Sequence, residues 1–392
     1  MLNSFFPPWP SFSQDERHAV DAVLESGRVN YWTGDQGKLF EQEFAAYSGC
    51  QYGIALANGT LALELALRAV GIGEGDEVVV TSRTFIASAS AIVMVGATPV
   101  FADVDPDSQN ITAETIRQVI SPKTKGVVCV HLAGWPCDMD PILEMARAEG
   151  LKVIEDCAQA HGASYKDRPV GSLGDVAAFS FCQDKIMSTG GEGGMLLTNN
   201  AAYWKKAWAF KDHGKDWDEV NRQDHPPGFR WLHNSFGSNY RLTEMQSAIG
   251  RVQLKKLDQW RALRKSNAEI LNSAVKDTQL ARITAPAAGI IHAHYKHYIF
   301  LNQEFLKKSW SRDRIMAAIQ DAGVPCFSGS CSEIYLEKAF KLGQLAPEAS
   351  LPVAKQLGET SLMFLVHPTI LMEDMEAASN VVSTIFNQAC SS

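Results

Sequence analysis

Three side chains that could act together in one reaction stand close together in the sequence. Asp156 and Ser180 each stand at or near the end of a short apolar run, and Lys185 follows just before the glycine-rich stretch GGEGG. In an open α/β sheet, ligands bind at the edge formed by the carboxyl ends of the strands. A neutral lysine amine can attack an aldehyde there. Residues 151–200 therefore predict a site that combines a nucleophilic lysine with an acid, although a lone lysine after a strand is more often surface charge.

A second pattern, earlier in the chain, is typical of an anion site. Gly59 and Thr60 follow the apolar run GIALAN and open the helical pattern TLALELAL. Free backbone amides at the start of a helix attract anions, and the Thr60 hydroxyl could add a further contact. A Gly-Thr pair before a helix is also a common cap, so both interpretations stay open at this point.

The elements needed to position these residues follow from the hydrophobic pattern. From Gly53 onward, short apolar runs alternate with helical patterns, which favours parallel pairing with right-handed crossovers. Seven runs are predicted to be strands: GIALA, EVVVTS, TPVFADV, GVVCVHL, LKVIED, DVAAFSF and GGMLLTN. We therefore expect an α/β fold with a mainly parallel seven-stranded sheet.

The rest of the chain divides around this predicted sheet. Helical spacing predicts helices over residues 11–25 and 38–48, and residues 211–241 form a long polar loop. Helical periodicity over residues 242–274 would bridge to a smaller α+β part, which contains the predicted strand HYKHYIFLN and a closing helix over 373–388. We expect a large domain over residues 1–250 and a small one over 251–392.

Composition narrows the class of protein. The chain has 392 residues, of which 46% are hydrophobic and 20% charged, and its formal net charge is −8. This acidic balance argues against broad nucleic-acid binding, and no apolar run reaches the ~20 residues of a membrane helix. The N-terminal residues do not resemble a secretory signal. Eight scattered cysteines without a CxxC pair are typical of reduced thiols, so we expect a cytoplasmic protein.

A metal centre is not predicted. His292, His294 and His297 cluster on a predicted strand, and Asp138 and Asp140 stand close together in a loop. Neither group completes the ligand set of a metal site.

Seven motifs in order resemble those of one family, the pyridoxal-phosphate-dependent sugar aminotransferases of the DegT/DnrJ/EryC1/StrS type. The motifs are ANGTLALELAL, GDEVVVTSRTF, GATPVFADVD, EDCAQAHGA, SFCQDK, GGEGG and GSNYRLTEMQSAIG. The resemblance covers nearly the whole chain. It implies the fold type I architecture of pyridoxal 5'-phosphate (PLP) enzymes, resembling aspartate aminotransferase.

The resemblance also assigns roles to the residues of the central stretch. Lys185 would bond covalently to PLP, whereas related dehydratases carry histidine at this position. Asp156 would hold the pyridine nitrogen of PLP protonated, with a helix cap as its structural alternative. Gly59, Thr60 and Ser180 would bind the cofactor phosphate.

Three further cofactor contacts are implied only by the resemblance. Phe85 occupies the position of a ring that stacks on the cofactor, although alone it would be taken for a core phenylalanine. Gln159 matches a residue near the phenolic oxygen of PLP. Asn239, in GSNYR, matches an asparagine that reaches the phosphate in the neighbouring subunit, which implies a homodimer with shared active sites.

Candidate substrate contacts are less specific. Tyr31 and Trp32 lie in the loop NYWTGDQG, where exposed aromatic residues are as consistent with a packed hinge as with substrate binding. His161 is a polar group near Gln159 with no defined partner in the sequence.

The predicted function is transfer of an amino group, with glutamate as donor, to a keto sugar that is expected to be nucleotide-linked. Surface polysaccharide and amino-sugar biosynthesis use such products. Residues 323–340, GVPCFSGSCSEIYLEKAF, depart from the family pattern of a His-Tyr-Pro segment. The alternatives are a sugar dehydratase, a transaminase of a free keto sugar or cyclic ketone, and a non-catalytic regulator that senses an amino sugar.

Overall fold

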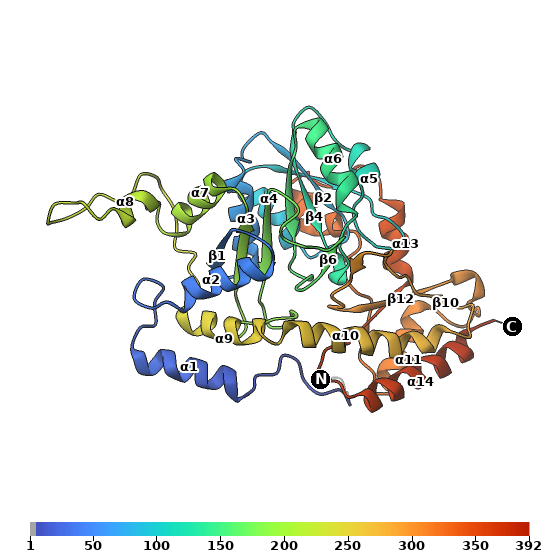
Figure 1. Ribbon diagram of the computed structural model, residues 1–392. Coiled ribbons are helices and arrows are strands. Elements are labelled where there is room, and N and C mark those ends of the chain that lie inside the picture. The colour runs from blue at the N-terminus through green and yellow to red at the C-terminus, as the bar shows by residue number, and fades with distance from the viewer. Residues whose placement is uncertain (1–4, 392) are drawn as a thin grey trace.

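The computed structural model describes residues 5–391 and places a seven-stranded sheet at the centre of the molecule (Figure 1). The strand order is β1-β9-β8-β5-β4-β2-β3. The five strands from β8 to β3 are parallel, while β9 runs antiparallel to both β8 and β1. The strands are β1 (Tyr52–Leu56), β2 (Glu77–Thr81), β3 (Thr98–Ala102), β4 (Thr124–Val130), β5 (Lys152–Asp156), β8 (Val176–Ser180) and β9 (Gly194–Thr198). The prediction of a mainly parallel seven-stranded sheet is confirmed.

Helices cover both faces of this sheet, because its strands carry apolar side chains on both sides. One face packs against α2 (Gln36–Tyr47), α5 (Ala113–Arg117) and α6 (Met139–Glu149). The other packs against α3 (Gly59–Ala69), α4 (Ala87–Met94) and α7 (Ala201–Lys211). The result is a three-layer α/β/α arrangement.

Strand alternation decides which polar side chains share a face. On β5, Val153 belongs to the core under α2 and α6, and Ile154 to the core under α3 and α4. Glu155 therefore points toward the first helix layer, and Asp156 toward the second. On β8, Ala178 packs on the α3 side, so Ser180 shares the face of Asp156.

A second, four-stranded antiparallel sheet lies in the C-terminal part of the chain. Its order is β10 (Ala281–Arg282), β12 (His297–Leu301), β14 (Ser361–Phe364) and β13 (Cys326–Phe327). Helices α11 (Arg312–Asp321) and α14 (Met372–Ala389) share its apolar core. Shorter elements complete this part: η2 (Ser273–Val275), η3 (Gln303–Phe305), η4 (Ile334–Leu336), α12 (Lys338–Leu342) and α13 (Pro352–Thr360).

Several elements connect the two sheets. The helical periodicity over residues 242–274 corresponds to two helices, α9 (Glu244–Leu254) and α10 (Leu257–Asn272), with α1 (Gln14–Ser26) packed along α9 (Figure 1). A three-stranded ribbon pairs β11 (Ile290–Ile291) with β6 (Ser164–Tyr165), which pairs with β7 (Arg168–Pro169). The tip of the long loop, residues 222–238 beyond α8 (Trp217–Asn221), projects from the body of the molecule. Among the described residues, no helix is long and apolar enough to cross a membrane.

Candidate active site

Lys185 lies in the turn that follows β8, and two backbone contacts hold it there. Its amide donates to the Cys182 carbonyl at 3.1 Å. Its carbonyl accepts a 2.8 Å hydrogen bond from the Trp9 indole, so the N-terminal segment helps to fix the loop. The Lys185 side chain is only 14% exposed, which means that its amine points into the molecule rather than into solvent.

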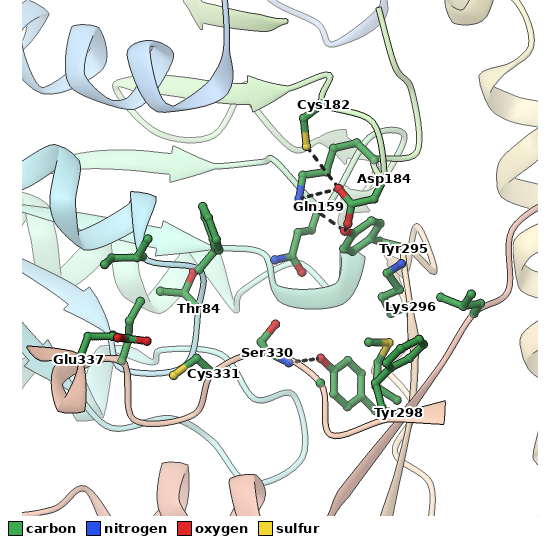
Figure 2. Close-up of a pocket in the computed structure, with 18 residues that line it drawn as sticks. Thr84, Gln159, Cys182, Asp184, Tyr295, Lys296, Tyr298, Ser330, Cys331 and Glu337 are labelled. Carbon is green, nitrogen blue, oxygen red and sulfur yellow. Dashed lines mark hydrogen bonds and ion pairs between the residues drawn. The ribbon is translucent and has the colours of Figure 1, made fainter. Parts of the chain in front are cut away.

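The Lys185 ammonium faces an acid and a phenol (Figure 2). Its Nζ lies 3.5 Å from the Tyr295 hydroxyl and 3.8 Å from Asp184 Oδ1. The Tyr295 hydroxyl donates to Asp184 Oδ2. Burial, followed by the charge of Asp184, raises the pKa of Tyr295. Burial opposes ionisation of Asp184, but the positive charge of Lys185 and the Tyr295 hydrogen bond outweigh it, so the pKa of Asp184 is lowered.

Two cavities meet at Lys185. The inner cavity, of about 460 Å³, runs under the N-terminus of α3. The outer cavity, of about 660 Å³, is walled by the C-terminal part of the chain. Seven predicted site residues line the inner cavity: Gly59, Thr60, Phe85, Asp156, Gln159, Ser180 and Lys185. Phe85, Gln159 and Lys185 line both cavities.

Asp156 lies at the end of β5, is 4% exposed and lines the inner cavity. Its Oδ2 accepts a 2.7 Å hydrogen bond from the Ser88 hydroxyl, and its Oδ1 accepts from the Ala158 amide at 3.1 Å. Burial raises the pKa of Asp156, against the lowering effect of these two hydrogen bonds. The carboxylate caps its local turn, as the structural alternative required, yet it also faces the cavity without a cation in salt-bridge distance among the described residues.

The first turn of α3 also lines the inner cavity. Asn58 is the cap residue, because its side chain accepts from the Leu61 amide at 2.9 Å. The Gly59 and Thr60 amides, in the first turn, have no partner within the helix. A Cβ atom at Gly59 would lie 2.5 Å from Ser180 Cβ, so glycine is required for β8 and α3 to approach this closely. The hydroxyls of Thr60 and Ser180 and the N-terminus of α3 together form a cradle for an anion.

Phe85 and Gln159 both line this cavity. The Phe85 side chain is 66% exposed, which contradicts its interpretation as a core residue. Gln159 is fixed by a 2.8 Å hydrogen bond from the Ala133 amide to its Oε1. Its amide nitrogen is left to face the cavity (Figure 2).

Asn239 lies outside both cavities. It is exposed, and its backbone forms an isolated β-bridge with Asp212 at the base of the long loop. The structure therefore does not bring Asn239 to Lys185 of the same chain.

Tyr31 and Trp32 also lie apart from Lys185. Tyr31 is buried, donates to Glu41 at 3.1 Å and has the Lys211 ammonium 3.7 Å from its ring centre. Both rings line a separate cavity of about 340 Å³ beside α7. Within this chain, Tyr31 and Trp32 therefore do not line the cavities at Lys185.

His161 is fully buried beneath the sheet, on the side of α2. Its ring packs against Phe44, Phe179 and Phe181. Burial lowers the pKa of His161 to about 3, so the ring is neutral at neutral pH. It lines neither the inner nor the outer cavity, so the structure does not bring His161 to the surface of the Lys185 site.

Only one of the three clustered histidines lies on the strand where the sequence placed them all. His297 lies within β12, whereas His292 and His294 precede that strand, with their rings stacked 4.2 Å apart.

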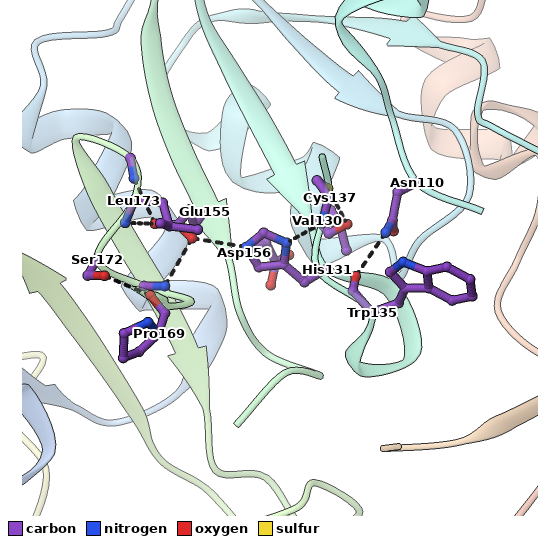
Figure 3. A network of polar contacts seen from close by, with 12 residues as sticks. Asn110, Val130, His131, Trp135, Cys137, Glu155, Asp156, Pro169, Ser172 and Leu173 are labelled. Atoms are coloured by element: carbon purple, nitrogen blue, oxygen red, sulfur yellow. Dashed lines mark hydrogen bonds and ion pairs between the residues drawn. The ribbon is translucent and has the colours of Figure 1, made fainter. Parts of the chain in front are cut away.

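A buried network lies directly behind Asp156 (Figure 3). Glu155 Oε2 lies 3.0 Å from His131 Nε2 and accepts from the Gly171 amide at 2.9 Å. Its Oε1 accepts from the Leu173 and Gly174 amides, both at 2.8 Å. Because the Cys137 amide donates to His131 Nδ1 at 3.0 Å, the His131 proton lies on Nε2 and is donated to Glu155.

Sequence reasoning missed four residues of the site: Asp184, Tyr295, Lys296 and Ser88. Asp184 stands beside Lys185, and that adjacency was the only signal available. The segment that departs from the family pattern supplies much of the outer wall, including Phe327, Ser330, Cys331, Ile334 and Glu337.

The α/β/α fold and the lysine beside an anion cradle are typical of PLP-dependent enzymes, and comparison with known proteins leads to the same class. Residues 10–385 match the DegT/DnrJ/EryC1/StrS aminotransferase family, and the chain belongs to it. It is a PLP-dependent aminotransferase of fold type I, as the sequence predicted.

Particular relatives narrow the comparison. An aminotransferase of known structure from Psychrobacter cryohalolentis is 55% identical, with a TM-score of 0.96 over 98% of this chain and 99% of that one. GDP-perosamine synthase of Escherichia coli O157:H7 is 38% identical over 73% of this chain and 75% of its own length. A UDP-N-acetyl-3-dehydro-alpha-D-glucosamine 3-aminotransferase of Acidithiobacillus ferrooxidans is 36% identical over 90% and 89%.

The residues of the inner cavity fit PLP. The cradle of Gly59, Thr60 and Ser180 suits a phosphate, and Asp156, which lines the same cavity, is a buried acid with no cation in salt-bridge distance among the described residues. Lys185 reaches the same cavity with a shielded amine. Phosphate, pyridinium and aldehyde are thus each matched by a group of the required chemistry.

Proposed function

We propose that the enzyme transfers an amino group from glutamate to the keto group of a nucleotide-linked sugar, for surface polysaccharide or amino-sugar biosynthesis. One observation carries the proposal: the amine of Lys185 lies where a cradle that fits the cofactor opens into a larger second cavity. The relatives support the sugar class, because two of them are named for GDP-linked and UDP-linked sugars.

We assign the roles in the inner cavity as follows. Bound PLP supplies an electron sink for the substrate carbon. Lys185 holds the cofactor between turnovers and moves a proton to and from that carbon. Asp156 keeps the ring nitrogen protonated, and Gly59, Thr60 and Ser180 bind the phosphate. Phe85 covers one face of the ring and Gln159 lies near its phenolic oxygen.

Spectroscopy of the two half-reactions tests this function. Glutamate should convert the absorbance of the PLP enzyme to that of the aminated form and release 2-oxoglutarate. A panel of nucleotide-linked keto sugars should then restore the first spectrum and yield an amino sugar detectable by mass spectrometry. Failure of every nucleotide-linked sugar, with success of a free keto sugar or cyclic ketone, would contradict the proposed acceptor.

Lys185→Ala tests the role of the lysine. We expect turnover to fall by roughly 10²- to 10⁴-fold, the usual contribution of proton transfer by a positioned side chain. Borohydride reduction of the wild-type enzyme should attach the cofactor to the peptide that contains Lys185. Near-normal turnover in the variant would exclude the role.

We further propose that the active unit is a homodimer in which Asn239 serves the partner's phosphate site. Asn239 is exposed and lies outside the cavities of its own chain. The neighbouring loop tip exposes 81% of Phe229, 84% of Trp231 and 98% of Phe236. Aromatic side chains that are this exposed are typical of surfaces that bind another protein, and a two-fold interface would bring each loop to the other subunit.

Subunit mixing tests the shared site. Lys185→Ala and Asn239→Asp chains should each have low activity. A mixed dimer would hold one site with both lesions and one with neither, so activity should recover on exchange. If Asn239 served its own subunit, each site would keep one lesion and mixing would restore nothing.

Two further assignments complete the proposal. We place the boundary between the large and small domains near residue 250, within α9. We place the enzyme in the cytoplasm, where its cysteines, all free among the described residues, would stay reduced.

A further inference from the structure

Lys296 lies at the junction of the outer cavity and the C-terminal part of the chain. It directly precedes β12 and lines the outer cavity, with its ammonium 4.7 Å from the centre of the Tyr295 ring (Figure 2). The Lys185 ammonium lies 4.9 Å from the centre of the same ring. Lys296 is therefore a near neighbour of the residue that is proposed to carry the cofactor.

The charges that line the outer cavity single out Lys296. Four ionised side chains line it: Lys185, Lys296, Asp184 and Glu337. Lys185 is committed to the cofactor, and Asp184 is hydrogen-bonded to Tyr295. Within residues 5–391, no carboxylate lies in salt-bridge distance of the Lys296 ammonium. Among the residues that the structure describes, Lys296 is the one cation lining this cavity that remains for a ligand.

The environment of Lys296 strengthens its attraction for an anion. Burial, helped by the charges of Arg264 and Lys185, lowers its pKa to about 8 against the opposing effect of Asp184. A cation that is partly stripped of water interacts more strongly with an anion than one on the surface. A bound anion would replace the hydration that Lys296 has lost.

The two half-reactions impose one common demand. Both substrates would react with the cofactor beside Lys185 and must occupy the outer cavity in turn. The donor, glutamate, carries carboxylates, and a nucleotide-linked acceptor carries phosphates. A single cation beside Lys185 can serve each of them, because the two are never bound together.

We propose that Lys296 is the anion-binding residue shared by both substrates: it binds a carboxylate of the amino donor in one half-reaction and a phosphate of the sugar nucleotide in the other. This inference rests on the proposed function. It makes Lys296 a determinant of substrate class, and it requires that neutral ligands gain nothing from this residue.

Binding to the PLP-loaded enzyme tests the proposal without turnover. Glutarate, UDP and GDP serve as unreactive probes, titrated calorimetrically into wild-type, Lys296→Met and Lys296→Arg enzymes. We expect Lys296→Met to bind glutarate and at least one nucleotide about 10- to 100-fold more weakly, the range for loss of a charged hydrogen bond. Lys296→Arg should recover much of the loss, and Lys308→Met, at an exposed lysine remote from the cavity, should match wild type.

Half-reaction kinetics add a second measurement. Lys296→Met should raise the glutamate concentration needed for half-maximal rate by a similar factor, with a much smaller change in the saturating rate. Cofactor content and melting temperature should stay at wild-type values. A Lys296→Met enzyme that had lost its fold would show a lower cofactor content and a lower melting temperature. In that case the affinities of Lys296→Arg for glutarate and the nucleotides would test the proposal.

Two outcomes would overturn the proposal. Unchanged affinities in Lys296→Met would mean that other groups, such as those of a partner subunit, hold the anions. Loss of affinity for glutarate alone, or for nucleotides alone, would exclude a shared role. Neither result depends on which sugar is the acceptor. If no nucleotide-linked sugar reacted with the wild-type enzyme, the proposed acceptor would be wrong. The glutarate affinities would still show whether Lys296 binds the carboxylate of the donor.

Discussion

Glu155 and Asp156 are adjacent acids at the end of β5, and the fold treats their carboxylates in opposite ways. Glu155 points into the layer under α2 and α6, where four donors surround its two oxygens: three loop amides and His131. Asp156 points toward α3 and α4, where it receives one hydroxyl and one amide. Burial opposes ionisation of both. The donors around Glu155 outweigh it and lower its pKa, while the pKa of Asp156 stays raised.

The difference separates a structural acid from one reserved for a ligand. Glu155 ties the turn at residues 171–174 to β5, and through His131 it also ties down the end of β4. Its hydrogen bonds are complete within the chain. Asp156 is equally buried but lacks compensation for its charge, which is costly unless a cation arrives. A buried acid that faces a cavity with so few donors favours a cationic ligand, which supports the proposed role of Asp156 toward the protonated pyridine nitrogen of PLP.

Of the substitutions that test this difference between Glu155 and Asp156, Asp156→Asn should have the largest effect, and that effect should be on catalysis. Asp156→Asn keeps the size of the side chain but cannot balance a protonated ring nitrogen. We expect the glutamate half-reaction to slow by about 10²- to 10³-fold, the usual cost of removing one electrostatic contact at a reacting group. Stopped-flow spectroscopy of the cofactor-loaded variant measures it. An unchanged rate would mean that Asp156 has no part in the chemistry.

The matched change at the neighbouring residue should act on stability instead. In Glu155→Gln, the amide oxygen can still accept from the Leu173 and Gly174 amides. The new amide nitrogen then faces two other donors, the Gly171 amide and His131 Nε2. We expect the free energy of unfolding to fall by about 2–3 kcal/mol, the cost of leaving buried donors unpaired. Chemical denaturation measures it. Half-reaction rates per bound cofactor should change less than in Asp156→Asn. A rate loss as large as that of Asp156→Asn, with unchanged stability, would mean that Glu155 acts in catalysis rather than in the fold.

Much of this arrangement could be predicted because it is local. All seven strands of the large sheet were recognised, since each is a short apolar run that is separated by helical spacing from the next. Residues such as Lys185 and Asp156 were found because the ends of parallel strands meet at one edge. The cap of α3 is Asn58 rather than the Gly-Thr pair, a difference of one or two positions that only the hydrogen bond to Leu61 decides.

What could not be predicted depends on contacts between distant parts of the chain. Tyr295 and Lys296 come to Lys185 from the C-terminal part, and no spacing in the sequence records that approach. Trp9 reaches the Lys185 carbonyl from the N-terminal segment. Tyr31 was as consistent with substrate binding as with packing, and its place between Glu41 and Lys211 follows from the meeting of α2 and α7. Alternation shows that Glu155 and Asp156 face opposite ways, but not which one faces the cavity.

The smallest expected effect, and the most direct comparison, is the pH dependence of stability in the cofactor-free protein. The pKa of Glu155 lies below its ordinary value of 4.5 in the folded state. Its contribution is therefore present above that value and is lost only as pH falls through the folded pKa. The pKa of Asp156 lies above its ordinary 3.8, so its contribution is present below 3.8 and is lost as pH rises through the folded pKa.

Unfolding measured between about pH 5 and pH 8 should separate the two acids. Across this window the deficit of Glu155→Gln should stay constant, because Glu155 is ionised throughout in both states. Asp156→Asn should gain on wild type as pH rises through the folded pKa of Asp156, because burial raises that pKa and the ionised carboxylate then destabilises the wild-type fold. Loading the cofactor should abolish the gain, because a protonated ring nitrogen then favours the ionised Asp156. If the cofactor-free Asp156→Asn protein instead lost stability relative to wild type as pH rose, Asp156 would be a satisfied structural acid like its neighbour.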